Sequence, residues 1–217
     1  MKHLLIPIVV AGSLLAHGQV SQPELNGAKG CTHPITMSIL IDNSGSMINK
    51  RAEVVAASFA LVRASKAHDE VGIVDFSDDA INALPDGEDF TRDIQQMEKA
   101  LASIDSRGGS AMRDAVRTSI DQVEQNAHND RKILVLVTDG DDTSSKVTEE
   151  QLLSRVKNSG VRIYSIGLLN DSTPGHSMAK DALERLAETS GGEAYYPKEL
   201  AEMESISQEI ANGAHKQ

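Results

Sequence analysis

Tryptophan is absent from this 217-residue chain, and only three phenylalanines, three tyrosines and one cysteine occur in it. So few aromatic rings argue against a binding surface that stacks on bases or sugars. The core must instead be built from aliphatic side chains and methionine. The single cysteine, Cys31, has no partner for an internal disulfide.

A cluster of basic residues is also missing. The formal net charge at pH 7 is −11, and the acidic residues are spread along the chain rather than held in one block. Nucleic acids and anionic membrane surfaces bind clustered Lys and Arg, so neither is expected as a partner. The same charge is compatible with the binding of a cation.

The apolar run near the N-terminus is shorter than the roughly 20 residues that a membrane-spanning helix needs. This run, Leu4–Ala16, follows Lys2 and ends at small residues around Gly18. The arrangement predicts that residues 1–18 are a signal peptide that is cleaved near Gly18. We therefore expect an exported protein of bacterial type, periplasmic or secreted, without a stable membrane anchor. A buried N-terminal strand or helix is the alternative.

Residues 19–34 are polar and contain several prolines and glycines, which predicts a linker or N-terminal tail. Beyond them, strand-like and helix-like segments alternate, which predicts one domain over residues 35–213. Continuous apolar runs are typical of parallel strands that are buried on both faces. They occur at Ile35–Ile41, Val71–Phe76, Ile133–Thr138 and Val161–Gly167.

A shorter run, Ala80–Leu84, follows the second strand too closely for a crossover helix, so it should pair antiparallel at a sheet edge. A last short strand is expected at Glu193–Tyr196. Helical periodicity predicts helices around Val55–Val62, Thr91–Ser103, Met112–Val123, Thr148–Asn158, Ala179–Thr189 and Lys198–Ala211. The alternation predicts an α/β fold with a doubly wound, Rossmann-like open sheet. The sheet should be mostly parallel with one short antiparallel edge strand, and helices should cover both faces.

The end of the first predicted strand is the most informative stretch. The apolar run stops at Asp42, and Ser44 and Ser46 follow at alternate positions. Alternate side chains of an extended segment point the same way, so these three can converge on one point. One carboxylate and two hydroxyls are hard oxygen ligands, which suit Mg²⁺, Ca²⁺ or Mn²⁺. The sequence therefore predicts a divalent cation at this strand end.

Two further loops should lie at the same edge, because doubly wound sheets bind ligands beyond the carboxyl ends of their strands. Residues Ser106–Ser110 form a glycine turn that leads into a helix, and Thr138–Asp142 follows the most apolar strand. These loops would add the oxygen atoms of Ser110 and Asp139 to the crevice. Capping of the following helix is an alternative role for Ser110.

The three segments together resemble the von Willebrand factor type A domain family, and they occur in the family's order. Asp42–Ser46 looks like the family's D-x-S-x-S motif, Gly108–Ser110 looks like the segment that supplies a distal threonine, and Thr138–Gly140 looks like its strand-ending T-D-G. The resemblance covers about Pro34 to Ala211. One difference is Ser110, which keeps the hydroxyl of the usual threonine but lacks its methyl group, so its χ1 angle is less restricted.

The resemblance implies a metal-ion-dependent adhesion site rather than an enzyme. Ser44 and Ser46 would bind the cation directly, and Ser110 would take the threonine position. Asp42 and Asp139 would hold the cation mostly through water molecules. The implied cation is Mg²⁺, or Ca²⁺ or Mn²⁺ in its place, and an Asp or Glu of a protein partner would complete its coordination. The implied function is protein–protein interaction of the cell-adhesion kind.

Two other functions stay open. A Mg²⁺-dependent phosphoryl-transfer enzyme with Asp42 as its nucleophile would need a basic clamp, for which the crevice loops offer only Arg107 and, less well placed, Lys146. A structural assembly module with a vestigial metal site would bind through its helix faces instead.

Four more polar residues near this edge have modest expected roles. Asp141 and Asp142 should form a solvated acidic turn, and His176 should be a solvated loop residue. Asp75 should be a hydrogen-bonded residue near a strand end, with a place close to the metal as the alternative.

Overall fold

The computed structural model describes residues 33–103, 108–169 and 175–216. The predicted signal peptide, Cys31 and nearly all of the predicted linker lie outside these residues, as do Arg107 and the first part of the loop before His176. None of the helices in the described ranges is long and apolar enough to span a membrane.

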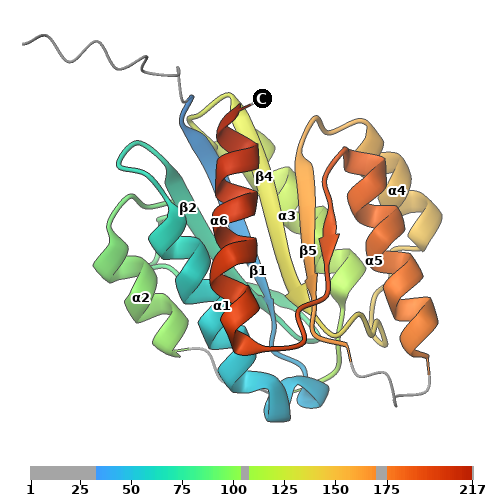
Figure 1. Ribbon diagram of the computed structural model, residues 1–217. Coiled ribbons are helices and arrows are strands. Elements are labelled where there is room, and N and C mark those ends of the chain that lie inside the picture. Colours follow the sequence, from blue (N-terminus) through green and yellow to red (C-terminus); the bar gives the residue numbers. More distant parts are fainter. Residues whose placement is uncertain (1–32, 104–107, 170–174, 217) are drawn as a thin grey trace, which may run out of the picture. The chain divides into compact units, whose positions relative to one another are not determined.

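A six-stranded sheet runs through the middle of the domain in the order β3-β2-β1-β4-β5-β6 (Figure 1). Its strands are β1 (Ile35–Asp42), β2 (Glu70–Phe76), β3 (Ala80–Asn82), β4 (Arg131–Thr138), β5 (Arg162–Gly167) and β6 (Ala194–Tyr195). All neighbouring pairs are parallel except β2 and β3, which form the predicted antiparallel edge pair. The strand order reverses between β1 and β4, so the predicted crevice lies beyond the carboxyl ends of these two strands.

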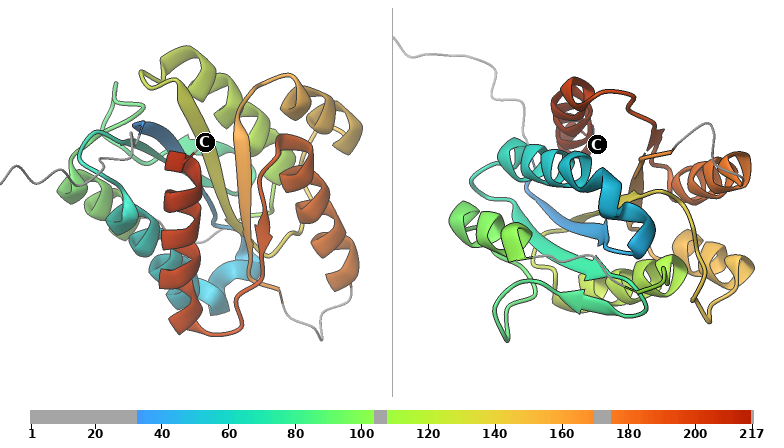
Figure 2. Two further views of the ribbon diagram at one scale, coloured as in Figure 1. Left: turned by 45° about the horizontal axis from the view of Figure 1, so that its top comes forward. Right: turned by 90° about the horizontal axis from the view of Figure 1, so that it is seen from below.

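Helices cover both faces of the sheet, as predicted. The helices α1 (Arg51–Ala64), α2 (Ile94–Ser103) and α6 (Leu200–Lys216) contribute to the core on one face. The helices α3 (Met112–Asn126), α4 (Glu149–Lys157) and α5 (His176–Ser190) contribute to the core on the other. A view along the carboxyl edge shows α1 and α6 on one side of the sheet and α3 and α4 on the opposite side (Figure 2).

The central strands are apolar on both faces because each face is covered. In β1, Ile39 and Ile41 belong to the core beneath α1 and α6, whereas Leu40 belongs to the core beneath α3. All three are at most 1% exposed. In β4, Val135 and Leu136 divide between the two cores in the same way. This double burial explains why these strands appear in the sequence as unbroken apolar runs.

The C-terminal helix is longer than predicted, because buried polar contacts hold its last turn. α6 continues to Lys216 rather than ending near Ala211. The imidazole of His215 is 2% exposed, and its Nε2 lies 2.9 Å from Asp69 Oδ2. Arg131 donates hydrogen bonds from Nη1 to the carbonyl oxygens of Ala214 and His215. These contacts satisfy carbonyl groups that the end of a helix leaves without partners.

Asp69 links three segments of the chain at the edge opposite the predicted crevice. Besides contacting His215, its carboxylate accepts hydrogen bonds from the backbone N–H groups of Ile35 (3.0 Å) and Lys66 (2.7 Å). The side chain is 1% exposed. Both nitrogens of the His215 ring face an acceptor, since Nδ1 faces the carbonyl oxygen of Ala211. The C-terminal helix is therefore fixed to the start of β1 through one buried carboxylate.

Removal of this carboxylate should destabilise the domain strongly. Breaking a buried pair by removing one partner typically costs about 3–5 kcal/mol. We expect Asp69→Ala to lower the free energy of unfolding, measured by urea denaturation, by about this amount. Asp130→Ala is the matched control because Asp130 is exposed, and its effect should stay within about 0.5 kcal/mol. Equal effects of the two substitutions would contradict this role of Asp69.

Candidate metal centre

Asp42 is the last residue of β1 and lies beside the end of β4. Its side chain is only 1% exposed. Carboxylate oxygen Oδ1 accepts a hydrogen bond from the backbone N–H of Ser44 at 3.0 Å, and Oδ2 accepts one from Thr138 Oγ1 at 2.6 Å. The Ser110 hydroxyl lies 3.5 Å from the same Oδ2. Burial raises the pKa of Asp42, and the nearby Asp139 carboxylate adds to this rise, while hydrogen bonds from Ser44 and Thr138 oppose it.

The two serine hydroxyls that follow Asp42 lie side by side. The Oγ atoms of Ser44 and Ser46 are 3.0 Å apart. Ser44 is buried and precedes the short 3₁₀ helix η1 (Gly45–Lys50), whereas Ser46 is exposed in its first turn. The pair therefore runs from the buried carboxylate of Asp42 out to the surface, as the alternation in the sequence predicts.

Backbone hydrogen bonds hold the Ser110 loop against both neighbouring loops. Gly45 donates from its N–H to the Gly108 carbonyl at 3.2 Å. The Ser110 carbonyl accepts from the N–H groups of Thr143 and Ser144, at 2.8 and 2.9 Å. Gly108 has a φ of +78°, and a Cβ there would lie 2.6 Å from the Asp78 carboxylate, so only glycine suits the position. Three segments far apart in the sequence are thus fixed at one edge.

Asp139 makes an ion pair that the sequence did not indicate. Its Oδ2 lies 3.0 Å from the Nζ atom of Lys50, the last residue of η1, and its side chain is 7% exposed. Lys50 follows Asp42 by eight residues, and it reaches Asp139 only because the intervening residues coil into η1. No motif marks this position in the sequence, which is why Lys50 was missed.

Thr138 is a second residue whose role the sequence left undefined. Its hydroxyl donates to Asp42 Oδ2 and accepts a hydrogen bond from the backbone N–H of Gly140 at 2.9 Å. One side chain therefore positions both the buried carboxylate and the turn that carries Asp139. The T-D-G pattern places a threonine here, but only the structure assigns it these contacts.

The acidic turn after β4 differs from the expectation in part. Asp141 is exposed, as expected, and partial desolvation together with the neighbouring Asp139 carboxylate raises its pKa. Asp142 is not a solvated residue: its carboxylate accepts hydrogen bonds from the Arg113 N–H at 2.8 Å and from Ser145 Oγ at 2.9 Å. The sequence prediction was wrong for Asp142, because it did not foresee that this turn packs against the start of α3.

Asp75 and His176 lie close to the edge but in different settings. Asp75 Oδ2 accepts a hydrogen bond from Asn43 Nδ2 at 3.2 Å, as expected of a hydrogen-bonded residue near a strand end. His176 is the first residue of α5 rather than a loop residue, and it lines a cavity beside Lys50. The loop segment of residues 170–174 that precedes it lies outside the described residues.

The donor set at this edge suits a hard divalent cation. It consists of carboxylate and hydroxyl oxygens, which are the ligands that such cations prefer. Among the described residues, no three His, Cys, Asp or Glu side chains are clustered so that they could hold a metal ion, so the set depends on the serine hydroxyls. Burial raises the pKa values of Asp42 and Asp141, and the neighbouring Asp139 carboxylate raises both further. The ammonium group of Lys50 lies 3.0 Å from Asp139 Oδ2, so this carboxylate already has a positively charged neighbour. The residues present therefore fit a bound Mg²⁺, although metal binding by them stays a prediction.

Asp114 supports the loop that follows Asp139. Its carboxylate accepts hydrogen bonds from the backbone N–H groups of Lys146 and Val147, both at 2.9 Å. Burial acts to raise the pKa of Asp114, but these hydrogen bonds outweigh it and hold the pKa below its ordinary value. The charged form is therefore favoured in the folded state.

Substitution of Asp114 should give a destabilisation that depends on pH. A depressed carboxyl pKa adds stability above the unfolded value, near 4, and this stability is lost as the pH falls through the lower folded value. We expect Asp114→Asn to cost about 1 kcal/mol at pH 7, because the side chain is only partly buried. The difference from the wild type should shrink below about pH 4. Thermal unfolding at several pH values measures this, with exposed Asp79→Asn as the control; a difference that does not vary with pH would contradict the assignment.

A model of the von Willebrand factor type A domain matches residues 37–209. No curated protein sequence matches the chain. A solved structure described as von Willebrand factor type A from Catenulispora acidiphila shares 18% identity with a TM-score of 0.69, over 84% of this chain and 43% of that one.

Two similar solved structures belong to bacterial pilus proteins. The vWF domain of the type V pili tip protein Mfa5 from Porphyromonas gingivalis is 13% identical with a TM-score of 0.67, over 86% of this chain and 98% of that domain. The pilus adhesin SpaC from Lactobacillus rhamnosus GG is 15% identical with a TM-score of 0.65, over 84% of this chain and 30% of the adhesin. At such identities the likeness shows a shared fold.

Proposed function

Because the chain belongs to the von Willebrand factor type A domain family, we propose that it is a binding module that holds a divalent cation and uses it to bind a protein partner. The cation is Mg²⁺, or Ca²⁺ or Mn²⁺ in its place. The residues proposed to hold it are Asp42, Ser44, Ser46, Ser110 and Asp139. When bound, the cation would offer a coordination position to an Asp or Glu carboxylate of the partner.

The observation that carries this proposal is the continuous set of oxygen atoms at the end of β1. The Ser44 and Ser46 hydroxyls lie 3.0 Å apart, and Ser44 adjoins the buried Asp42 carboxylate through its backbone N–H. The hydroxyls are neutral, so a cation that they bind would stay attractive to an incoming carboxylate. The Asp42 carboxylate lies next to these hydroxyls, and its burial raises its pKa.

The geometry disfavours a phosphoryl-transfer enzyme with Asp42 as its nucleophile. Both carboxylate oxygens of Asp42 accept hydrogen bonds, and the side chain is 1% exposed. An attacking oxygen must reach the substrate. Arg107, the better placed of the two basic residues expected as a phosphate clamp, lies outside the described residues, and Lys50 is paired with Asp139. We therefore favour binding over catalysis.

Export is part of the same proposal. The predicted signal peptide over residues 1–18 and the similarity to bacterial pilus proteins both support a protein that acts outside the cytoplasm. The partner would then be another exported or surface protein. The pilus roles are those of the relatives, and only a location outside the cytoplasm is proposed for this chain.

The proposal predicts that divalent cations bind at Asp42. We expect calorimetric titration of the mature domain with Mg²⁺, and separately with Mn²⁺, to give one site per chain. Asp42→Asn should abolish the binding heat, because it removes the charge while keeping the side-chain volume. Saturating Mg²⁺ should also raise the melting temperature of the wild type, since a ligand that binds only the folded state stabilises it. EDTA should reverse this rise.

Asp79→Asn is a suitable control for charge removal at an exposed position, and it should bind Mg²⁺ as the wild type does. Asp42→Asn should remain folded in EDTA, because it relieves a buried charge. Unchanged Mg²⁺ binding by a folded Asp42→Asn variant would contradict the proposed site. A partner complex that forms equally well in EDTA would favour the assembly module with a vestigial site.

A further inference from the structure

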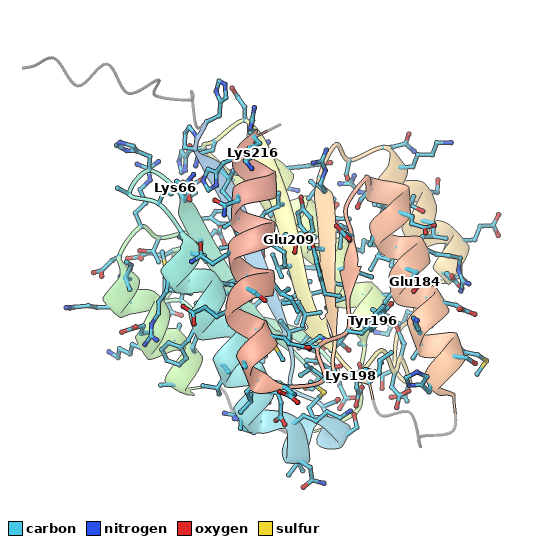
Figure 3. All side chains as sticks on the ribbon, in the orientation of Figure 1. Lys66, Glu184, Tyr196, Lys198, Glu209 and Lys216 are labelled. Carbon is cyan, nitrogen blue, oxygen red and sulfur yellow. The ribbon has the colours of Figure 1, made fainter. Side chains whose placement is uncertain are left out.

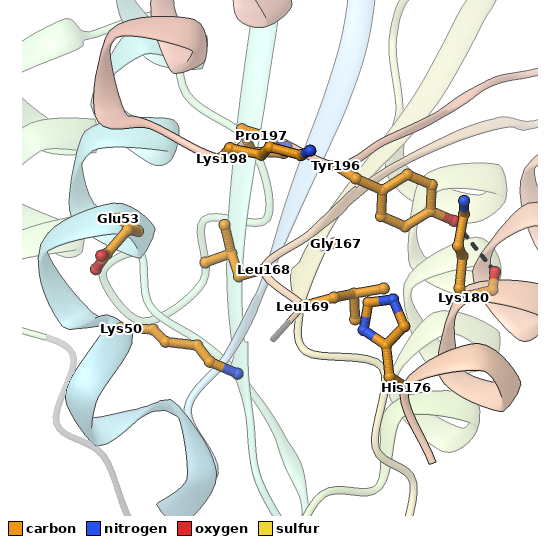
Figure 4. Close-up of a pocket in the computed structure, with 10 residues that line it drawn as sticks. All are labelled: Lys50, Glu53, Gly167, Leu168, Leu169, His176, Lys180, Tyr196, Pro197 and Lys198. Atoms are coloured by element: carbon orange, nitrogen blue, oxygen red, sulfur yellow. Dashed lines mark hydrogen bonds between the residues drawn. The ribbon is translucent and has the colours of Figure 1, made fainter. Parts of the chain in front are cut away.

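A cavity of about 630 Å³ opens beside the proposed cation site. Its walls come from the carboxyl end of β5, the start of α5 and the connection between β6 and α6, with Lys50 and Glu53 on the remaining side (Figure 4). The side chains of Lys50, His176 and Lys198 surround the opening between these elements (Figure 4). This cavity is separate from the oxygen atoms proposed to hold the cation.

The cavity gathers positive charge in a chain that is strongly acidic overall. Among the described residues that line it, three are lysines, Lys50, Lys180 and Lys198, and one is acidic, Glu53. The formal net charge of the chain is −11, so such a concentration of lysines is not what its composition alone would give. A concave surface on which one sign of charge is in excess attracts ligands of the opposite sign.

Lys180 and Lys198 differ in whether a neighbouring side chain already contacts their ammonium group. The Lys180 ammonium lies 5.1 Å from the centre of the Tyr196 ring and 3.7 Å from Glu184. The Tyr196 hydroxyl donates to the Lys180 carbonyl at 3.1 Å, which fixes the ring as one wall. Lys198 forms no salt bridge with any residue in the described ranges. Its charge is therefore available to a ligand.

The cavity and the proposed cation site meet at Lys50. The Lys50 ammonium lines the cavity and also lies 3.0 Å from Asp139 Oδ2. A ligand that reached the cation from the solvent side of Ser46 would therefore have the lysine-lined cavity beside it. Figure 3 shows Tyr196 and Lys198 near the carboxyl end of β5, whereas Lys66 and Lys216 lie at the opposite end of the domain.

We propose that this cavity binds a second carboxylate of the partner, so that the module recognises an acidic peptide segment with two neighbouring Asp or Glu residues. One carboxylate would face the cation, and the other would lie among Lys50, Lys180 and Lys198. The first contact rests on the proposed function, whereas the second does not need the cation. Charge complementarity of this kind contributes mainly to specificity and to the association rate.

The test compares two acetylated peptides, Gly-Asp-Gly-Gly-Asp-Gly and the same peptide with its second Asp replaced by Asn. Binding to the mature domain in Mg²⁺ is followed by amide chemical shifts. We expect the two-carboxylate peptide to bind about tenfold more tightly, with shifts at Gly167, Lys180 and Lys198 that the other peptide does not cause. The Lys180→Gln and Lys198→Gln double variant should remove most of this difference while its Mg²⁺ titration stays unchanged.

Lys66→Gln is the matched control, because this exposed lysine lies at the opposite edge, and it should keep the full difference between the peptides. An equal preference in the wild type and the double variant would overturn the cavity proposal even if Mg²⁺ binds.

In EDTA, the two-carboxylate peptide should still shift the cavity residues weakly, and added salt should reduce this effect. Shifts at the cavity without any Mg²⁺ binding would support this inference and refute the proposed function. Inorganic phosphate that displaces the peptide only at the cavity would also support the anion site, and a peptide that shifts neither region would contradict it.

Discussion

The arrangement of this domain's functional edge depends on one buried carboxylate. Asp42 ends the central strand β1, and its hydrogen bond from Thr138 joins it to the end of the neighbouring strand β4. Helices cover both faces of these two strands. A ligand can therefore approach the Asp42 carboxylate only from the loops at the carboxyl edge of the sheet. Burial raises its pKa, because a carboxylate removed from water is disfavoured in its charged form. A divalent cation coordinated by the adjoining hydroxyls would relieve this cost, which is the physical reason to expect one there.

The loops around Asp42 are held in place before any ligand arrives. Gly45 binds the Gly108 carbonyl, Ser110 binds the loop after β4, and Asp114 anchors the far end of that loop. Preorganised ligands lower the entropic cost of binding. Lys50 adds a feature that the motifs do not contain, since its ammonium group occupies a position against Asp139 and extends the positive surface toward Lys198. The two proposals therefore assign a cation site and a neighbouring anion site to the same edge of the sheet.

Much of the fold could be predicted from the sequence, because buried parallel strands appear as continuous apolar runs and the hairpin of β2 and β3 is too short for a crossover. The structure also brings Asp42, Ser44, Ser46 and Ser110 together, and alternation and strand-end placement were sufficient to indicate this. Lys50 could not be predicted, since its contact depends on how η1 coils. Asp142 was misjudged, because one of its partners, Arg113, lies on α3, 29 residues away in the sequence. The length of α6 depended on a buried pair between Asp69 and His215, which no local pattern reveals.

Paramagnetic broadening by Mn²⁺ tests the central claim most directly. Substoichiometric Mn²⁺ added to the isotope-labelled mature domain should first broaden the amide signals of Ser44, Ser46, Ser110 and Asp139, because broadening falls steeply with distance from the ion. Signals at the opposite edge, near Asp69 and His215, should stay sharp, and excess Mg²⁺ should restore the broadened ones. Broadening centred on another acidic region, such as Asp78 and Asp79, or no broadening at all, would contradict the proposal that Asp42 and its neighbours hold a cation.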